Sequence, residues 1–240
     1  MKDLLRLLRV YIIRSFALIR AKKLELSNRI LIVAPHPDDE VIGCSGLIQQ
    51  AIIEEKEIFV CILTGGEGSH RNCCNIKAQD LIDNRRKLAK SIDGELGIPD
   101  NHLFFLNFPD GDIVSKVNDY LELERVISEI QPDSIYIPHQ KGEGWSDHIQ
   151  AGNIVKSIIA NSPIALYEYC VWFWYYNVWN LNWRQSFLLK MNKLSSLKKT
   201  NSIDNYTRPL APCGKPYSGV LPKLFIKANK WNNELYFKLK

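Results

Sequence analysis

Short apolar runs alternate with helix-like segments from residue 29 onward, and this order constrains the fold more than any other feature of the chain. Residues 30–34 read ILIVA, apolar at every position, which is typical of a strand buried on both faces of a parallel sheet. Further strands are expected at 57–64, 103–108, 134–138 and 164–172, with helices at 41–55, 76–96, 117–130 and 147–160. The sequence therefore predicts an α/β fold with a parallel sheet between two layers of helices.

Composition excludes several classes of protein. Of the 240 residues, 46% are hydrophobic and 24% are charged, which is a globular composition and not that of a disordered chain. No stretch of 18 apolar residues is free of charge, so we expect no transmembrane span. The six cysteines contain no C-x-x-C pair and are interpreted as reduced thiols in a cytoplasmic protein. Basic residues gather at the two ends without interleaved stacking motifs, so no nucleic-acid partner is predicted.

Residues 1–23 carry seven basic side chains and one acidic side chain, Asp3. Leucine, isoleucine and aromatic residues recur there at helical spacing, while Lys2, Arg6, Arg9 and Arg20 share one side of the helical wheel. Two interpretations stay open for this basic amphipathic helix: it lies on the anionic inner face of a membrane, or it packs on the domain. The predicted organisation is thus a helix over 1–23 and one domain over 24–240.

The motif most indicative of function is PHPDDE at 35–40, which follows the first strand and precedes a helix. Ligands of such sheets bind at the carboxyl ends of the strands. A histidine beside three acidic residues offers metal ligands and a general base, although acids can also simply stabilise the start of a helix. We predict that His36 and a following carboxylate share one ion. A third ligand is then expected from the end of another strand, where His139 and His148 are the candidates.

The order of motifs resembles the PIG-L/LmbE-like family of zinc-dependent N-acetylglucosaminyl de-N-acetylases. The resemblance runs over about residues 29–172, through PHPDDE, then TGGEG after the second strand, DG after the third and DH before the fourth helix, with a weaker similarity at 220–237. It implies a Rossmann-like three-layer sandwich with a mostly parallel sheet. It also implies hydrolysis of the acetamide of an N-acetyl amino sugar, carried on a glycan, glycolipid or nucleotide-sugar precursor, in polysaccharide biosynthesis.

The family's site residues can be carried over to matching positions. The resemblance implies that His36, Asp39 and His148 hold zinc and that Asp38 is the general base. Two histidines and one aspartate leave an open position for water, as a catalytic zinc needs, and the same donor set accepts Fe²⁺. Further expected roles are substrate contacts by Glu67, Arg85, Asp110 and Trp145, and supporting hydrogen bonds by Glu40 and Asp147. Arg85 could instead lie on a solvated helix face, and Asp110 could be an ordinary Asp-Gly turn residue.

The chain departs from the family pattern at Trp145, where the last motif usually carries a histidine near the oxyanion. An indole cannot donate a charged hydrogen bond, so oxyanion stabilisation would fall on zinc or on His139, for which a strand-end role without chemistry is equally open. Leu88 also stands where the family often has a glutamate. Trp145 motivates an alternative function, a catalytically impaired sugar-binding or regulatory protein on the same fold.

Overall fold

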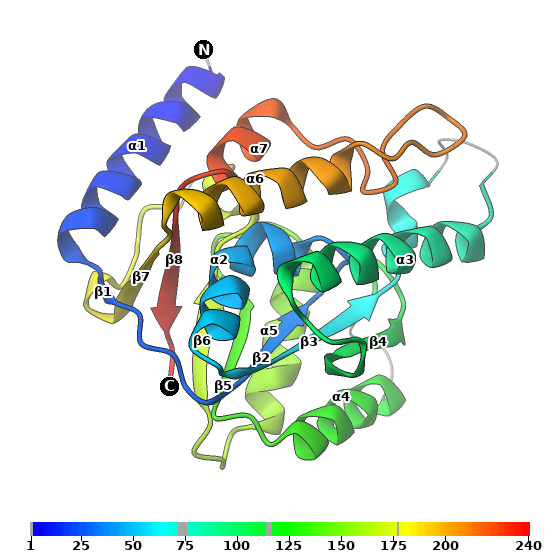
Figure 1. The fold of residues 1–240 in the computed structure, drawn as a ribbon, viewed down its shortest axis with the longest axis horizontal. Coiled ribbons are helices and arrows are strands. Elements are labelled where there is room, and N and C mark those ends of the chain that lie inside the picture. The colour runs from blue at the N-terminus through cyan, green and yellow to red at the C-terminus, as the bar shows by residue number, and fades with distance from the viewer. Residues whose placement is uncertain (1, 72–75, 114–116, 177) are drawn as a thin grey trace.

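The computed structural model describes residues 2–71, 76–113, 117–176 and 178–240 (Figure 1). Its centre is an eight-stranded sheet with the order β1-β7-β8-β6-β5-β2-β3-β4. The strands are β1 (Lys22–Lys23), β2 (Arg29–Ala34), β3 (Glu57–Thr64), β4 (Leu103–Phe108), β5 (Ser134–Pro138), β6 (Ala165–Tyr169), β7 (Ser186–Lys190) and β8 (Asn233–Lys238). The α-helices are α1 (Lys2–Arg20), α2 (Asp39–Ile53), α3 (Ala78–Leu96), α4 (Val117–Ile130), α5 (Ser146–Ile158), α6 (Lys193–Thr207) and α7 (Lys223–Asn229).

The predicted α/β fold is confirmed. Strands β2 to β6 are mutually parallel through the pairs β2–β3, β2–β5, β3–β4 and β5–β6. The bounds of β3, β4 and β5 coincide with the predicted ranges, and α2 begins two residues earlier than expected, at Asp39. This earlier start places the last two acidic residues of the PHPDDE motif, Asp39 and Glu40, inside the helix and leaves Asp38 at its N-cap.

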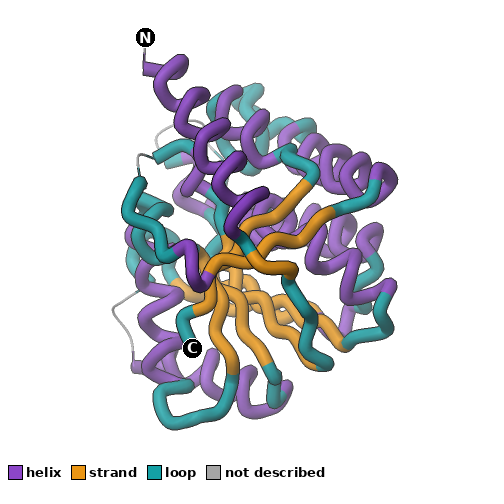
Figure 2. Tube along the Cα trace, turned by 90° about the vertical axis from the view of Figure 1, so that its left-hand side faces the viewer, coloured by secondary structure: helices purple, strands orange, loops and turns teal. Residues whose placement is uncertain are grey.

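Both faces of the sheet are covered, which explains the uninterrupted apolar runs of the central strands. In β2, Ile30 and Ile32 belong to the core beneath α2, α3 and α6, whereas Leu31 and Val33 belong to the core beneath α4 and α5. Successive side chains of a strand point to opposite faces, so a strand between two helical layers must be apolar at every position. Figure 2 shows the two helical layers on either side of the twisted sheet.

The end of the chain adds elements that the predicted alternation did not include. Strand β8 lies between β6 and β7 and is antiparallel to both, so the sheet is mostly but not wholly parallel. Helix α6 packs on α2 and α3, and α7 packs near Trp172 to Trp174. The C-terminal segment thereby extends the sheet and covers the helical layer next to the PHPDDE loop.

Helix α1 packs on the β7–β8 end of the molecule through Val10, Ile13 and Ala17 (Figure 1). Arg9 is buried beside them and donates hydrogen bonds to the carbonyl oxygens of Phe173 and Val178. The basic side of the predicted helix is thus turned partly toward the protein.

No helix in the described parts of the chain combines the length and the hydrophobicity needed to cross a bilayer. Cys44, Cys61 and Cys170 are buried thiols, while Cys73 and Cys74 lie outside the described residues.

Candidate active site

A cleft opens at the carboxyl ends of the adjacent strands β5, β2, β3 and β4. The polar side of its lining comes from the loop after β2, the turn after β4 and the first turn of α5. The apolar side of its lining comes largely from Trp172, Leu221 and Phe225. The parallel strands end at the same edge of the sheet, so loops that are distant in sequence meet here.

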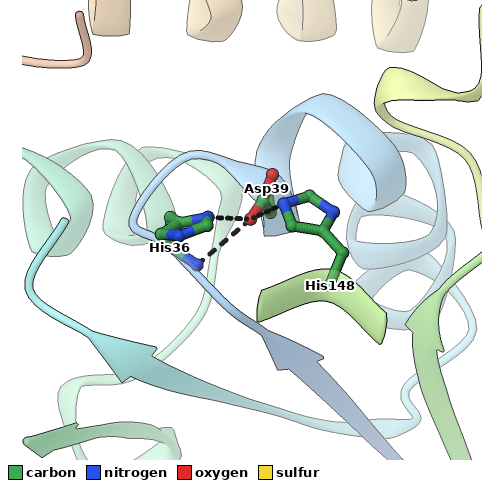
Figure 3. A group of neighbouring side chains, drawn as sticks. All are labelled: His36, Asp39 and His148. Atoms are coloured by element: carbon green, nitrogen blue, oxygen red, sulfur yellow. Dashed lines mark hydrogen bonds and ion pairs between the residues drawn. The ribbon is translucent and has the colours of Figure 1, made fainter. Parts of the chain in front are cut away.

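Three side chains converge in this cleft as the candidate metal ligands His36, Asp39 and His148 (Figure 3). Oδ2 of Asp39 lies 3.2 Å from Nδ1 of His36 and 3.3 Å from Nε2 of His148. One ligand atom from each residue lies within 4.8 Å of the others. Their approach follows from the fold, since His36 and Asp39 flank the β2–α2 turn while His148 stands in the first turn of α5.

The residues fit a divalent metal ion. Nε2 of His148 is buried, and its near neighbour is Oδ2 of Asp39 at 3.3 Å, so a ring nitrogen and a carboxylate oxygen face each other away from water. Burial alone would lower the pKa of His148, but Asp39 and Glu143 outweigh it and raise that pKa to about 9. The carboxylates that favour a cationic imidazole equally favour a bound cation. Two imidazoles and one carboxylate suit zinc and other first-row divalent metals.

Glu143 orients His148, a role that the sequence reading did not assign. Its Oε2 lies 3.2 Å from Nδ1 of His148, on the opposite side of the ring from Asp39. Glu143 is fully buried and also accepts hydrogen bonds from the backbone N–H groups of residues 171–173. A carboxylate on the second nitrogen of a ligand histidine fixes its ring and its tautomer. The loop sequence contains this glutamate, but only the tertiary structure brings it behind His148.

Asp38 stands at the start of α2 with φ of 131°, a conformation that is strained for any residue except glycine. Its backbone N–H donates to Oε2 of Glu40 at 3.0 Å, which helps to hold the turn. Glu40 is fully buried and accepts a second hydrogen bond, at 2.5 Å, from the hydroxyl of Tyr206 in α6. Tyr206 was absent from the sequence-based site because its helix lies more than 160 residues along the chain.

Arg85 lines the cleft and is buried, rather than lying on a solvated face of α3. Its guanidinium donates to the carbonyl oxygens of Gly66 and Pro37 and lies 3.3 Å from Oδ2 of Asp38. Only 4% of the residue is exposed. Burial raises the pKa of Asp38 to about 7, against the opposing effect of the Arg85 charge. This position suits a residue that orients Asp38, and because Arg85 also lines the cleft, its expected contact with substrate stays a prediction.

The turn after β4 joins the polar side of the cleft through Asp110. Its Oδ1 lies 3.1 Å from Nε2 of His36, and its backbone N–H donates to Glu67 at 3.1 Å. Glu67 is not among the described residues that line the cleft, so it supports Asp110 from behind. Asp147 lies 3.2 Å from the same nitrogen of His36 and accepts a hydrogen bond from the N–H of Gly111.

Trp145 and His139 occupy different environments. Trp145 is 48% exposed at the rim, where it contacts Trp172 edge-on with ring centroids 5.6 Å apart. His139 lies between Phe173 and Phe237 and is absent from the described lining of the cleft. Burial lowers the pKa of His139 to about 4. A buried ring among aromatic side chains, away from the lining of the cleft, does not favour the oxyanion role expected for His139.

Comparison with known proteins gives a family and a set of related folds. The family model of GlcNAc-PI de-N-acetylase, PIG-L, matches residues 31–159. The N,N'-diacetylchitobiose deacetylase from Pyrococcus horikoshii is similar at 20% identity and a TM-score of 0.61, covering 74% of this chain and 69% of that one. The A40926 pseudoaglycone deacetylase Dbv21 is similar at 16% identity and a TM-score of 0.68, covering 88% and 96%.

The same fold also supports a different reaction. GalB, the 4-carboxy-2-hydroxymuconate hydratase from Pseudomonas putida KT2440, is similar at 14% identity and a TM-score of 0.64, covering 88% of this chain and 96% of that one. At such identities the likeness concerns the fold alone. The chemistry therefore has to be argued from the family and from the residues of the cleft.

Proposed function

Because the chain belongs to the PIG-L family, which its motifs predicted, we propose that it is a zinc-dependent hydrolase that releases acetate from an N-acetylated amino sugar. The observation that carries this proposal is the convergence of His36, Asp39 and His148 in one cleft with Asp38 beside them. A metal-binding triad with an adjacent carboxylate is the set of groups that amide hydrolysis requires. Iron(II) would suit the same donors.

His36, Asp39 and His148 would hold the metal ion, with Glu143 fixing the ring of His148. Bound there, zinc supplies Lewis acidity that polarises the acetamide carbonyl and lowers the pKa of water. Asp38 accepts the proton of the attacking water as the new carbon–oxygen bond forms. It then returns that proton to the sugar nitrogen as the carbon–nitrogen bond breaks, so that acetate and a free amine leave.

The walls of the cleft support a sugar with an apolar extension as the substrate class. Asp110 offers a carboxylate to hydroxyl groups on the polar side, and Trp172 with Phe225 offers aromatic surface on the other. Aromatic rings commonly stack on the apolar faces of sugars and on aglycones. Two structural neighbours are deacetylases by name, one for N,N'-diacetylchitobiose and one for a pseudoaglycone, in keeping with this class.

Trp145 supports a second candidate function. With an indole at the rim where the family usually has a histidine, the protein could bind an N-acetyl sugar without hydrolysing it. The two functions differ in one measurable outcome. A deacetylase binds metal and releases acetate, whereas an impaired sugar-binding protein binds metal and the sugar without turnover.

The test combines metal content with acetate release. Wild type, His148→Ala and Asp38→Asn would be purified, their bound metal quantified, and acetate measured with N,N'-diacetylchitobiose and other N-acetylglucosaminides. We expect about one metal ion per chain and acetate release in wild type, loss of both in His148→Ala, and metal without acetate in Asp38→Asn. Full activity in Asp38→Asn would overturn the assignment of the base. Absence of metal from the wild type reconstituted with zinc would overturn the proposal as a whole.

A further inference from the structure

The outward face of α1 is apolar, the reverse of what a surface helix of a globular protein presents. Such a helix usually buries one apolar stripe and turns polar side chains to water. Helix α1 does bury one side, through Val10, Ile13 and Ala17, yet its opposite side is also apolar and is exposed. Exposed fractions there run from 47% to 78%, in Leu4, Leu5, Leu8, Tyr11, Phe16, Leu18 and Ile19.

Basic side chains flank this apolar face at both ends of the helix. Lys2 is exposed at the start, and Arg20, Lys22 and Lys23 are exposed at the end. Over residues 2–23 the one acidic side chain is Asp3, and it is paired with Arg6 at 3.0 Å. An occupant of the outward face would therefore meet apolar surface in the middle and positive charge at either end.

A groove beside α1 is also lined by apolar and basic side chains. Leu5 and Leu8 line it together with Tyr176 and Trp179, and the cationic side chains of Arg6 and Arg9 lie at its walls. Trp179 is 52% exposed. Tryptophan and tyrosine are enriched at the level of lipid head groups, where the ring meets hydrocarbon and its polar edge meets water. In Figure 2, α1 runs from the N-terminus across the side of the molecule that faces the viewer.

We propose that this protein docks on an anionic membrane surface through the outward face of α1 and the rim formed by Trp179. The apolar side chains would enter the interfacial layer while the flanking lysines and arginines contact lipid phosphates. A second copy of the chain fits less well, because a two-fold contact along α1 would bring the basic ends of the two helices together. The inner face of α1 would remain packed on the domain, as it is in the structure.

The experiment is co-sedimentation of the full chain with lipid vesicles. Vesicles of phosphatidylcholine alone would be compared with vesicles that contain about 30 mol% phosphatidylglycerol, at low and high salt. The test variant is the double substitution Leu8→Glu with Ile19→Glu, at two positions of the outward face that contribute nothing to the buried side. The matched control is Leu121→Glu, at a residue that is 52% exposed. Its helix, α4, lies at the opposite end of the molecule from α1 (Figure 1).

We expect wild type and Leu121→Glu to bind the anionic vesicles and to dissociate as salt rises, and the double variant to bind about tenfold more weakly or worse. Equal binding by the double variant, or no binding by wild type, would overturn the proposal. A dimer in light scattering that Leu8→Glu with Ile19→Glu converts to a monomer would assign the face to a second copy instead. Metal content and far-UV circular dichroism of the double variant should match wild type, which separates this test from that of the proposed function.

Discussion

The guanidinium of Arg85 lies 3.3 Å from the carboxylate of Asp38, and both side chains are buried. Arg85 also ties the loop after β2 to the loop after β3 through the carbonyl oxygens of Pro37 and Gly66. A buried carboxylate tends to take up a proton, and a neighbouring cation opposes this. Arg85 thus favours the ionised form of the candidate base against the effect of burial, which still raises the pKa of Asp38 to about 7.

Replacement of Arg85 tests this arrangement through the pH dependence of the reaction. In Arg85→Met the pKa of Asp38, already raised to about 7 by burial, should rise further because the opposing charge is gone. A base must be deprotonated to act, so the acid limb of kcat against pH should move to higher pH, while Arg85→Lys should lie closer to wild type. An unchanged acid limb in Arg85→Met, with kcat lowered equally at every pH, would contradict an electrostatic role.

Glu143→Gln tests the support of the metal ligand His148. We expect metal affinity to fall about 10- to 100-fold, because the carboxylate that orients the ring and favours a cation is lost. Competition with a chromophoric chelator measures the change. Glu168→Gln is the matched control, since Glu168 is also buried but accepts from the N–H of Gln140 and lies near His139 rather than His148. Equal losses in both variants would indicate a general effect of removing buried charge.

Tyr206→Phe removes the hydroxyl that donates to Glu40. The buried carboxylate loses a partner, so unfolding free energy should fall by about 1–3 kcal/mol. Because Glu40 also holds the N–H of Asp38, kcat should fall as well. Tyr236→Phe removes a comparable buried hydroxyl, which donates to Glu234 over 2.6 Å. Because this hydrogen bond is not part of the cleft, its loss should lower the unfolding free energy without lowering kcat. Denaturant titrations and steady-state kinetics separate the two effects, and an identical kcat in both variants would argue against positioning through Glu40.

His139 should make the fold sensitive to acid. Burial holds its pKa at about 4 in the folded protein, below the ordinary value of 6.5, so the unfolded chain binds a proton more readily. The contribution of neutral His139 to the free energy of unfolding is fully present above pH 6.5. It declines as the pH falls toward 4, by about 3 kcal/mol at most. In His139→Gln the side chain at this position cannot take up a proton, so the free energy of unfolding should decline less steeply between pH 6.5 and 4. The kcat of this variant near neutral pH should equal that of wild type. A large loss of kcat in this variant would restore His139 to the site.

The parallel half of the fold could be predicted from local pattern alone. Each of β2 to β5 is a short apolar run followed by a helical segment, and a right-handed crossover leaves little choice in how such units assemble. The C-terminal part could not be predicted in the same way. β8 pairs antiparallel with β6 and β7, and those pairings join residues far apart in the sequence without any local signal of partner or direction.

In the candidate site, too, some features could be predicted from the sequence and others depend on the fold. PHPDDE carries its chemistry in adjacent residues, so the sequence by itself predicted a metal site that includes His36 and a following carboxylate. The family resemblance then implied His148, rather than His139, as the third ligand and Asp38 as the base. Only the tertiary structure decided what stands behind them: Glu143 at His148, Tyr206 at Glu40, and Arg85 turned inward to Asp38. It also decided that His139 lies in an aromatic pocket. Motif chemistry is local, whereas burial and the partner of a charged group depend on segments that meet only when the chain has folded.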